Sequence, residues 1–177
     1  MKLIAPVLLS VLALLASSAK ADDTLAKFKG GIGVIPVSSG AGTDPTATVV
    51  NRNIVRGVQP PGQIWTIADL DATVKTDGSI RVKGRGLLLA GGNNIGFTAN
   101  VRVFATLICE TAAPFTEHST APAGIPLAPD GDFEIHDILS PAPPAPTECA
   151  SPVLLIRSAA GATGTGPWFA AGIPDLK

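Results

Sequence analysis

The sequence is poor in several residue types on which particular functions depend. Its 177 residues include no tyrosine, two histidines and two cysteines, and charged residues make up 15%. A Ser–His–Asp triad would therefore have to use His118 or His136, and no G-x-S-x-G motif is present. The run GGNNIG at 91–96 lacks the Lys-Ser/Thr pair of a phosphate-binding loop. Nothing marks a serine hydrolase or a nucleotide-binding protein, and we expect no cofactor.

The one long apolar run lies at the N-terminus. Lys2 precedes the segment LIAPVLLSVLALLA at 3–16, and SSAKA at 17–21 ends in an A-x-A pattern. This arrangement is typical of a secretory signal peptide. The run is shorter than the ~20 residues that a membrane-spanning helix needs, and no nearby cysteine suggests a lipid anchor. We expect cleavage after Ala21, a secreted or periplasmic protein, and no membrane span after removal of residues 1–21.

The remaining chain, residues 22–177, is weakly acidic. Loss of Lys2 and Lys20 reduces the basic residues from 13 to 11, against 14 acidic residues. Proteins that bind nucleic acid neutralise phosphates with basic surfaces. We therefore expect no nucleic acid partner. The length suits one domain with a sizeable core.

Cys109 and Cys149 are the two cysteines of the sequence. An exported chain meets an oxidising environment, and an even number of cysteines favours pairing. We expect a disulfide between them, which the chain-entropy model values at roughly 4 kcal/mol for a loop of about forty residues. Two separate buried thiols are the alternative. A zinc site would need more ligands than these two cysteines supply.

Glycine and proline are abundant, with 19 and 16 residues. They separate short runs of strand-like alternation, and the nearest helix candidate, at 22–29, is too short to be stable alone. Short, regularly interrupted strands indicate a sandwich or a barrel. We predict an all-β antiparallel β-sandwich, Greek-key or immunoglobulin-like. It comprises an N-terminal strand and loop at 22–46 and a β-sandwich domain at 47–177.

The clearest element is a hairpin around Asp77-Gly78. It joins the runs at 64–75 and 79–92, and an Asp-Gly pair between alternating runs is a strong hairpin signal. Gly84 and Gly86 indicate a bulge or a close backbone approach. The further predicted strands are an edge strand at 31–38, a strand at 47–58, the longest strand at 97–110, a buried strand at 153–159 and an edge strand at 167–174. A second hairpin is predicted at 125–139. In the first hairpin the inward residues are Leu70, Ala72, Val74, Ile80 and Val82, and the outward residues include Arg81, Lys83 and Arg85.

The segment PDGDFEIHDIL at 129–139 concentrates residue types that bind metals and move protons. Its pattern repeats that of DGSIRVK at 77–83: an Asp-Gly pair, a polar residue, and then alternation. We interpret it as a turn and an amphipathic strand, with Phe133 and Ile135 in the core and the polar row in solvent. If the two strands were neighbours, the acidic row of one would meet the basic row of the other.

A metal site is the alternative for the polar row of Asp132, Glu134 and His136. Strands rise about 3.3 Å per residue, which places Asp132 and His136 roughly 13 Å apart. One ion cannot hold both ends, because metal–ligand bonds are near 2 Å. A site would need Glu134, one neighbour and outside ligands, and His118 is the other histidine of the sequence.

Two hypotheses about function remain. The first is a secreted, non-catalytic β-sandwich with a binding or structural role at the cell envelope or outside the cell. Its partner would be a protein or a carbohydrate. Trp65 and Trp168 could stack on sugar rings, although lone tryptophans more often serve packing. The alternative is a secreted hydrolase or metal-dependent enzyme that uses the Glu134/His136 strand face with His118.

Six segments carry a resemblance to a known family. The chain resembles an uncharacterised family of small exported bacterial proteins over roughly residues 50–174. The resemblance implies bacterial export and no activity, ligand or catalytic residue. The segments are RGVQPPGQIWTIADL, DGSIRVKGRGLLLAGGNNIG, ATLIC, PLAPDGDFEI, SPVLLIRS and WFAAGIP.

Overall fold

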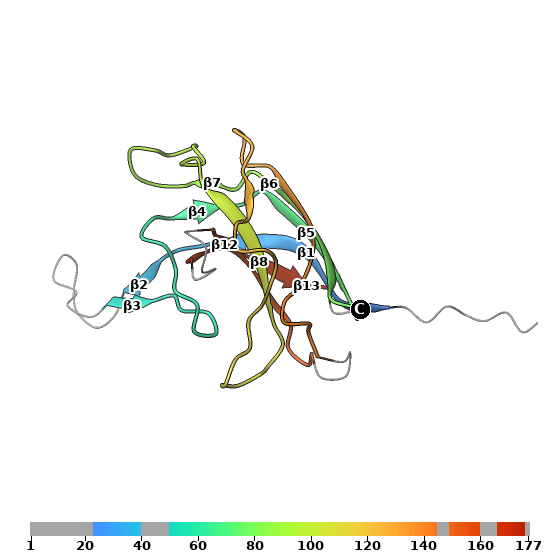
Figure 1. Ribbon diagram of the computed structural model, residues 1–177. Coiled ribbons are helices and arrows are strands. Elements are labelled where there is room, and N and C mark those ends of the chain that lie inside the picture. The colour runs from blue at the N-terminus through green and yellow to red at the C-terminus, as the bar shows by residue number, and fades with distance from the viewer. Residues whose placement is uncertain (1–22, 40–49, 145–148, 160–165, 176–177) are drawn as a thin grey trace, which may run out of the picture.

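The computed structural model describes residues 23–39, 50–144, 149–159 and 166–175 (Figure 1). The predicted signal peptide lies outside these residues. The described chain is all-β, as predicted, and contains thirteen strands and no helix. The strands are β1 (Thr24–Gly33), β2 (Val37–Ser39), β3 (Val50–Arg52), β4 (Trp65–Thr66), β5 (Asp69–Lys75), β6 (Ser79–Arg85), β7 (Leu88–Leu89), β8 (Arg102–Ile108), β9 (His118–Ser119), β10 (Ile125–Pro126), β11 (Phe133–Ile138), β12 (Val153–Ser158) and β13 (Trp168–Pro174).

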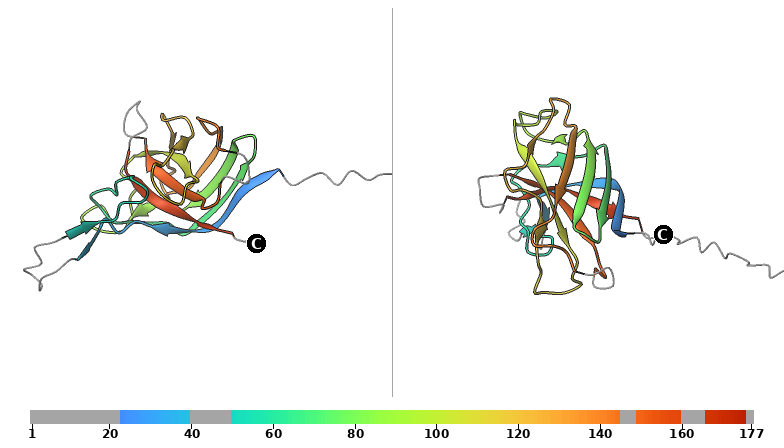
Figure 2. Two further views of the ribbon diagram at one scale, coloured as in Figure 1. Left: turned by 90° about the horizontal axis from the view of Figure 1, so that it is seen from below. Right: turned by 45° about the vertical axis from the view of Figure 1, so that its right-hand side comes forward.

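Nine strands form one antiparallel sheet in the order β10-β8-β12-β13-β1-β5-β6-β11, with β9 beside β8. The sheet curls, as Figure 2 shows, and its two end strands, β10 and β11, contact each other. The result is a nearly closed, barrel-like sheet. The prediction of a sandwich of two sheets is not confirmed. The pairs β2–β3 and β4–β7 form two small additional sheets.

The N-terminal strand differs most from the sequence prediction. The sequence predicts an edge strand at 31–38 and leaves 22–29 without a stable element, but β1 is a continuous strand of 10 residues between β13 and β5. It is the longest strand of the described chain, whereas β8 within 97–110 has 7 residues. The edge prediction for 167–174 is therefore wrong, because β1 gives β13 a second neighbour.

Apolar side chains fill the interior of the curled sheet. The inward residues predicted for the first hairpin, from Leu70 to Val82, are buried, and Phe133 and Ile135 of β11 join the same core. Strands β8 and β12 are buried on both faces. Segment 53–59 lies against β13. The main-chain N–H of Trp168, the first residue of β13, donates to Gln59 O at 3.0 Å.

The two Asp-Gly turns share one geometry, as their sequences predict. Gly78 and Gly131 both have φ of 84°, a left-handed conformation that glycine adopts without strain. The Oδ1 atoms of Asp77 and Asp130 each accept the N–H two residues further on, at 2.8 and 3.1 Å. The first turn joins β5 to β6. The hairpin predicted at 125–139 is wrong, because β10 pairs with β8 and β11 pairs with β6.

The predicted disulfide between Cys109 and Cys149 is confirmed. The two sulfur atoms are bonded at 2.08 Å, and both residues are buried in the core. The bond ties the end of β8 to the segment that leads into β12. Among the described residues, no helix is long and apolar enough to span a membrane.

Candidate functional site

Strand β11 carries the polar row that the sequence singles out. Its partner is β6, so that Glu134 lies opposite Lys83 and His136 lies opposite Arg81. The acidic row therefore meets the basic row. On the next strand Asp71 is also opposite Lys83, and charges of alternating sign follow one another across the sheet.

Glu134 and His136 form a hydrogen-bonded pair on this exposed face. His136 Nε2 lies 2.8 Å from Glu134 Oε1, and the Nε of Arg81 lies 3.4 Å from His136 Nδ1. Because the guanidinium can only donate, Nδ1 accepts and Nε2 carries the proton given to Glu134. This hydrogen bond lowers the pKa of Glu134, and the positive charges of Lys83 and Arg81 add to the effect. A carboxylate with a lowered pKa is a weak general base at neutral pH.

His118 lies elsewhere, inside the protein. It is 4% exposed, and its Nδ1 donates to Pro141 O at 2.9 Å. Glu134 and His136 face solvent on β11, so the three side chains do not form one site. Within the described part of the chain, no group of three or more His, Cys, Asp or Glu side chains could hold a metal ion.

Asp132, the first residue of the predicted polar row, has a structural contact. Its Oδ1 accepts the main-chain N–H of Gly86 at 3.0 Å. Its own N–H is held by Asp130 in the turn. The carboxylate therefore ties the start of β11 to the segment that follows β6.

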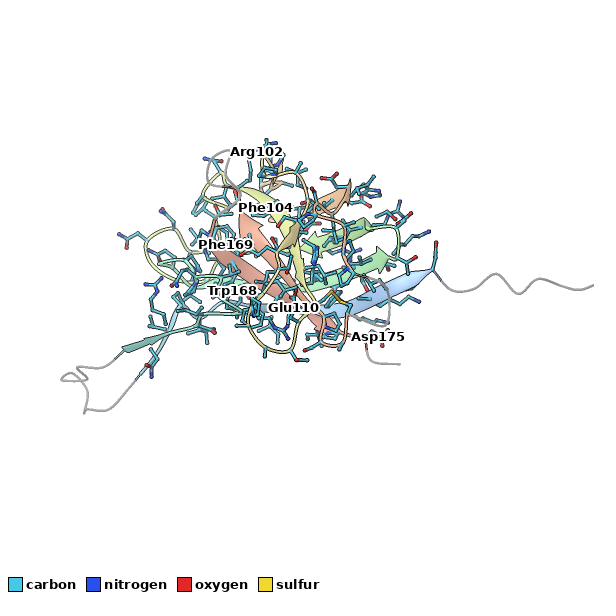
Figure 3. The ribbon with its side chains drawn as sticks, turned by 60° about the horizontal axis from the view of Figure 1, so that its bottom comes forward. Arg102, Phe104, Glu110, Trp168, Phe169 and Asp175 are labelled. Carbon is cyan, nitrogen blue, oxygen red and sulfur yellow. A yellow bond between two sulfur atoms is a disulfide. The ribbon has the colours of Figure 1, made fainter. Side chains whose placement is uncertain are left out.

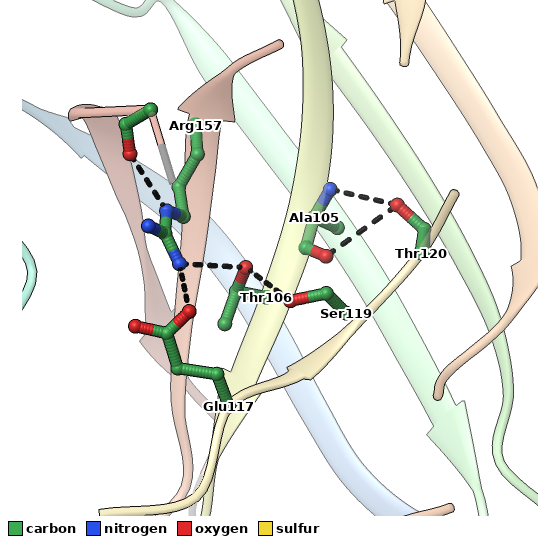
Figure 4. Close-up of polar contacts among 7 residues, drawn as sticks. Ala105, Thr106, Glu117, Ser119, Thr120 and Arg157 are labelled. Carbon is green, nitrogen blue, oxygen red and sulfur yellow. Dashed lines mark hydrogen bonds and ion pairs between the residues drawn. The ribbon is translucent and has the colours of Figure 1, made fainter. Parts of the chain in front are cut away.

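A buried arginine forms a polar network that the sequence analysis missed (Figure 4). Arg157 of β12 is 3% exposed. Its Nε donates to Gly166 O at 2.9 Å, and its Nη1 bonds the carboxylate of Glu117 and lies 3.4 Å from Thr106 Oγ1. The guanidinium also lies 5.3 Å from the centroid of the Phe104 ring.

This network links β12, β8 and the segment before β9. Thr106 Oγ1 continues it to Ser119 Oγ at 2.9 Å. A buried guanidinium stays charged and must be paired, so these contacts hold strands together. The sequence does indicate this buried arginine: in VLLIRS, the arginine follows four apolar residues of a predicted buried strand.

A hollow of about 300 Å³ opens beside the small sheet β4–β7. We call it the end hollow. Of its lining residues, Trp65 of β4, Leu89 of β7 and Phe169 of β13 are buried and form its floor. The exposed residues Gln63, Asn93 and Asn94, which carry side-chain amides, form its rim. No charged residue of the described chain lines it. Phe169 lies near the start of β13, and Asp175, which follows β13, lies at the opposite end of this strand (Figure 3).

Backbone hydrogen bonds place the two aromatic residues of the floor together. The N–H of Val34 donates to Phe169 O at 3.1 Å, and the N–H of Trp65 donates to Val34 O at 3.1 Å. Their rings stack with centroids 4.2 Å apart and planes inclined by 20°. Trp168, the other sugar-stacking candidate, lies buried, with its Nε1 donating to Asn53 O at 3.0 Å.

The rim loop, residues 91–100, has an unusual backbone and surface. Ala99 and Asn100 follow each other with φ of 51° and 53°, a conformation that costs about 1–3 kcal/mol per residue outside glycine. Ile95 and Phe97 are 62% and 65% exposed. A second hollow of about 380 Å³ shares Asn94 and Ala99 with the end hollow, and no charged residue lines it among those described.

The sequence of 91–96 indicates only that this run is not a phosphate-binding loop. Two large apolar residues in a loop rich in glycine and asparagine were the available signal. The floor could not be seen, because its residues come from distant positions in the chain.

Comparison with known proteins gave no match: no family model, no curated protein and no solved structure is similar to this chain. Fold and site together define an all-β antiparallel protein with one disulfide and an uncharged hollow beside its nearly closed sheet. The resemblance to a family of exported bacterial proteins stays a prediction.

Proposed function

We propose that this protein is an exported, non-catalytic binding protein that takes an uncharged ligand into the end hollow. The observation that carries the proposal is the composition of the hollow: an apolar floor of Trp65, Leu89 and Phe169 below a rim of side-chain amides. Ligand pockets are mostly apolar with a few polar groups that fix orientation. The nearly closed sheet serves as the scaffold.

The polar groups of the hollow favour binding over catalysis. Amide side chains donate and accept hydrogen bonds but do not titrate in the physiological range. They therefore supply neither a general acid nor a general base. A charged ligand would lose its hydration in the hollow without finding an opposite charge.

Export is part of the same proposal. Residues 1–21 serve as a signal peptide, and the mature protein works in the periplasm or outside the cell. The disulfide between Cys109 and Cys149 supports this placement, because such bonds persist in oxidising compartments.

The test is a fragment screen on the oxidised protein beginning at Asp22, read by two-dimensional NMR. Trp65 and Trp168 each give one indole N–H signal, and these report on the hollow and on a buried reference position. We expect uncharged fragments to shift the signals of Trp65 and of the Gln63, Asn93 and Asn94 amides. Charged fragments of equal size should leave them unchanged.

The variant Gln63→Ala should weaken these responses without unfolding the protein, because Gln63 is exposed. The proposal fails if no fragment at millimolar concentration shifts the signals of the hollow. It also fails if the responses gather at Glu134 and His136 instead.

A further inference from the structure

The end hollow and the second hollow lie next to each other on the rim loop. Resting on the proposed function, we infer that the ligand is an extended polypeptide segment. One apolar side chain of this partner occupies the end hollow, and its main chain crosses the rim loop at Asn94 toward the second hollow. A carbohydrate is the competing occupant, and four observations favour the polypeptide.

The first observation is the packing of the floor. The rings of Trp65 and Phe169 stack on each other, and each residue is only 4% exposed. Sugar recognition uses an open aromatic face against which the C–H groups of the sugar lie, and this floor offers no broad open face. An apolar side chain needs apolar contact area but no broad open ring face, and the floor of Trp65, Leu89 and Phe169 supplies that contact.

The second observation is the chemistry of the rim. Gln63, Asn93 and Asn94 each present an NH₂ donor and a carbonyl acceptor. A peptide group has the complementary pair, one N–H and one C=O. Amides around an apolar floor therefore match a main chain that flanks an apolar side chain.

The third observation is the exposed apolar surface beside the hollow. Ile95 and Phe97 are 62% and 65% exposed, and the loop is closed on β7 by Leu89 N–H to Phe97 O at 3.0 Å and Gly96 N–H to Leu89 O at 2.8 Å. Large apolar side chains held out by a fixed loop are typical of protein contacts. They give a polypeptide contact area beyond the anchor side chain.

The fourth observation concerns charge and size. Neither hollow has a charged lining residue within the described chain, so the anchor and its immediate neighbours in the partner are uncharged. A volume of about 300 Å³ lies at the lower end of the ~300–1,000 Å³ range of ligand pockets. A hollow of this volume suits one large side chain.

The experiment titrates the oxidised protein beginning at Asp22 with capped tripeptides, followed by NMR. The probes are acetyl-Gly-X-Gly-amide with Leu, Phe, Asp or Lys at X, and the neutral disaccharides cellobiose and chitobiose. We expect the Leu and Phe probes to shift the Trp65 indole signal and to bind at least tenfold more tightly than the Asp and Lys probes. The disaccharides should cause no shift there.

Two variants locate the contact. Asn94→Ala, on the rim shared by both hollows, should weaken tripeptide binding about fivefold or more. Phe97→Ser should weaken a capped heptapeptide centred on Phe and leave the tripeptide unchanged, because only the longer probe reaches it. Ile138→Ser is the matched control, since Ile138 is also 65% exposed but lies on β11.

The outcomes separate the two proposals. If the disaccharides shift the hollow and the peptides do not, the polypeptide is the wrong occupant and the binding function stands. Equal binding of apolar and charged tripeptides, or peptide shifts confined to the β6–β11 face, would also overturn the inference. If no probe or uncharged fragment shifts the hollow, the proposed function itself falls. Unchanged melting curves confirm that each variant remains folded.

Discussion

The indole ring of Trp65 stacks on the phenyl ring of Phe169, with centroids 4.2 Å apart. The two residues lie on β4 and β13, 104 positions apart in the chain. Their contact joins the small sheet β4–β7 to the main sheet and forms the floor of the end hollow. Stability and the proposed ligand binding therefore depend on the same pair.

Replacing Phe169 with alanine should leave a cavity under Trp65. We expect Phe169→Ala to lower the free energy of unfolding by about 3–5 kcal/mol, as truncation of buried aromatic residues does. Urea denaturation measures the change. Phe97→Ala is the control: it removes the same ring from an exposed position, and its effect should stay within about 0.5 kcal/mol. Similar losses in both variants would contradict the assigned packing.

Phe133 packs directly over Gly84, its partner on β6. A Cβ atom at Gly84 would lie 2.2 Å from the Phe133 ring, so Gly84→Ala should displace the ring and lower the stability by about 1–3 kcal/mol. Phe133→Ala alone should lower it by about 3–5 kcal/mol. In the double variant the two losses should not add, because alanine at 84 then meets no ring. Additive losses in chemical denaturation would show that the two residues are not in contact.

The bond between Cys109 and Cys149 should account for a large part of the stability. Alkylation of the exported protein without prior reduction should find no free thiol. Replacing both cysteines with serine should lower the free energy of unfolding by about 2–4 kcal/mol. The idea is refuted if mass spectrometry finds two alkylated cysteines in a folded sample.

Glu134 should titrate below the ordinary range of glutamate. The hydrogen bond from His136 lowers its pKa, with help from nearby positive charges. Because the folded pKa is the lower one, the associated stabilisation is present above the unfolded pKa and disappears as the pH falls through the folded value. An NMR titration of the Glu134 carboxyl should show the shift, and His136→Ala should raise the pKa toward normal. An unchanged value in that variant would remove His136 as the cause.

Divalent ions should not stabilise the protein through the β11 face. Zinc or calcium at micromolar concentration should leave the melting temperature unchanged, and so should a chelator. An ion that binds only the folded state would raise the melting temperature by mass action. A rise with one ion that is lost in both Glu134→Ala and His136→Ala would instead support the metal-dependent alternative.

The sequence pattern predicted those parts of the fold that depend on residues close together in the chain. The β5–β6 hairpin needs only an Asp-Gly turn and an alternation of apolar and polar residues, and residues 69–85 contain both. The pairing of β1 with β13 brings Ile32 opposite Ala171, and no short-range signal records such a partner. Because the sequence did not indicate β1 as a full strand, β13 was also wrongly predicted to lie at a sheet edge.

The candidate site divides in the same way. The polar row of Glu134 and His136 was placed correctly on a solvent-exposed strand face, since alternation alone decides it. The end hollow needed tertiary structure, because Trp65, Leu89 and Phe169 meet only when three strands are assembled. Of its parts, only the rim loop with Ile95 and Phe97 could have been noticed in the sequence.

The disulfide has a topological consequence for the intact molecule. By joining Cys109 to Cys149, it makes the intervening chain, with β9, β10 and β11, part of a covalent ring. A protease that cuts once between these cysteines opens the ring but releases no fragment. Such a nicked molecule keeps its mass, apart from one added water, until a reductant separates it into two pieces.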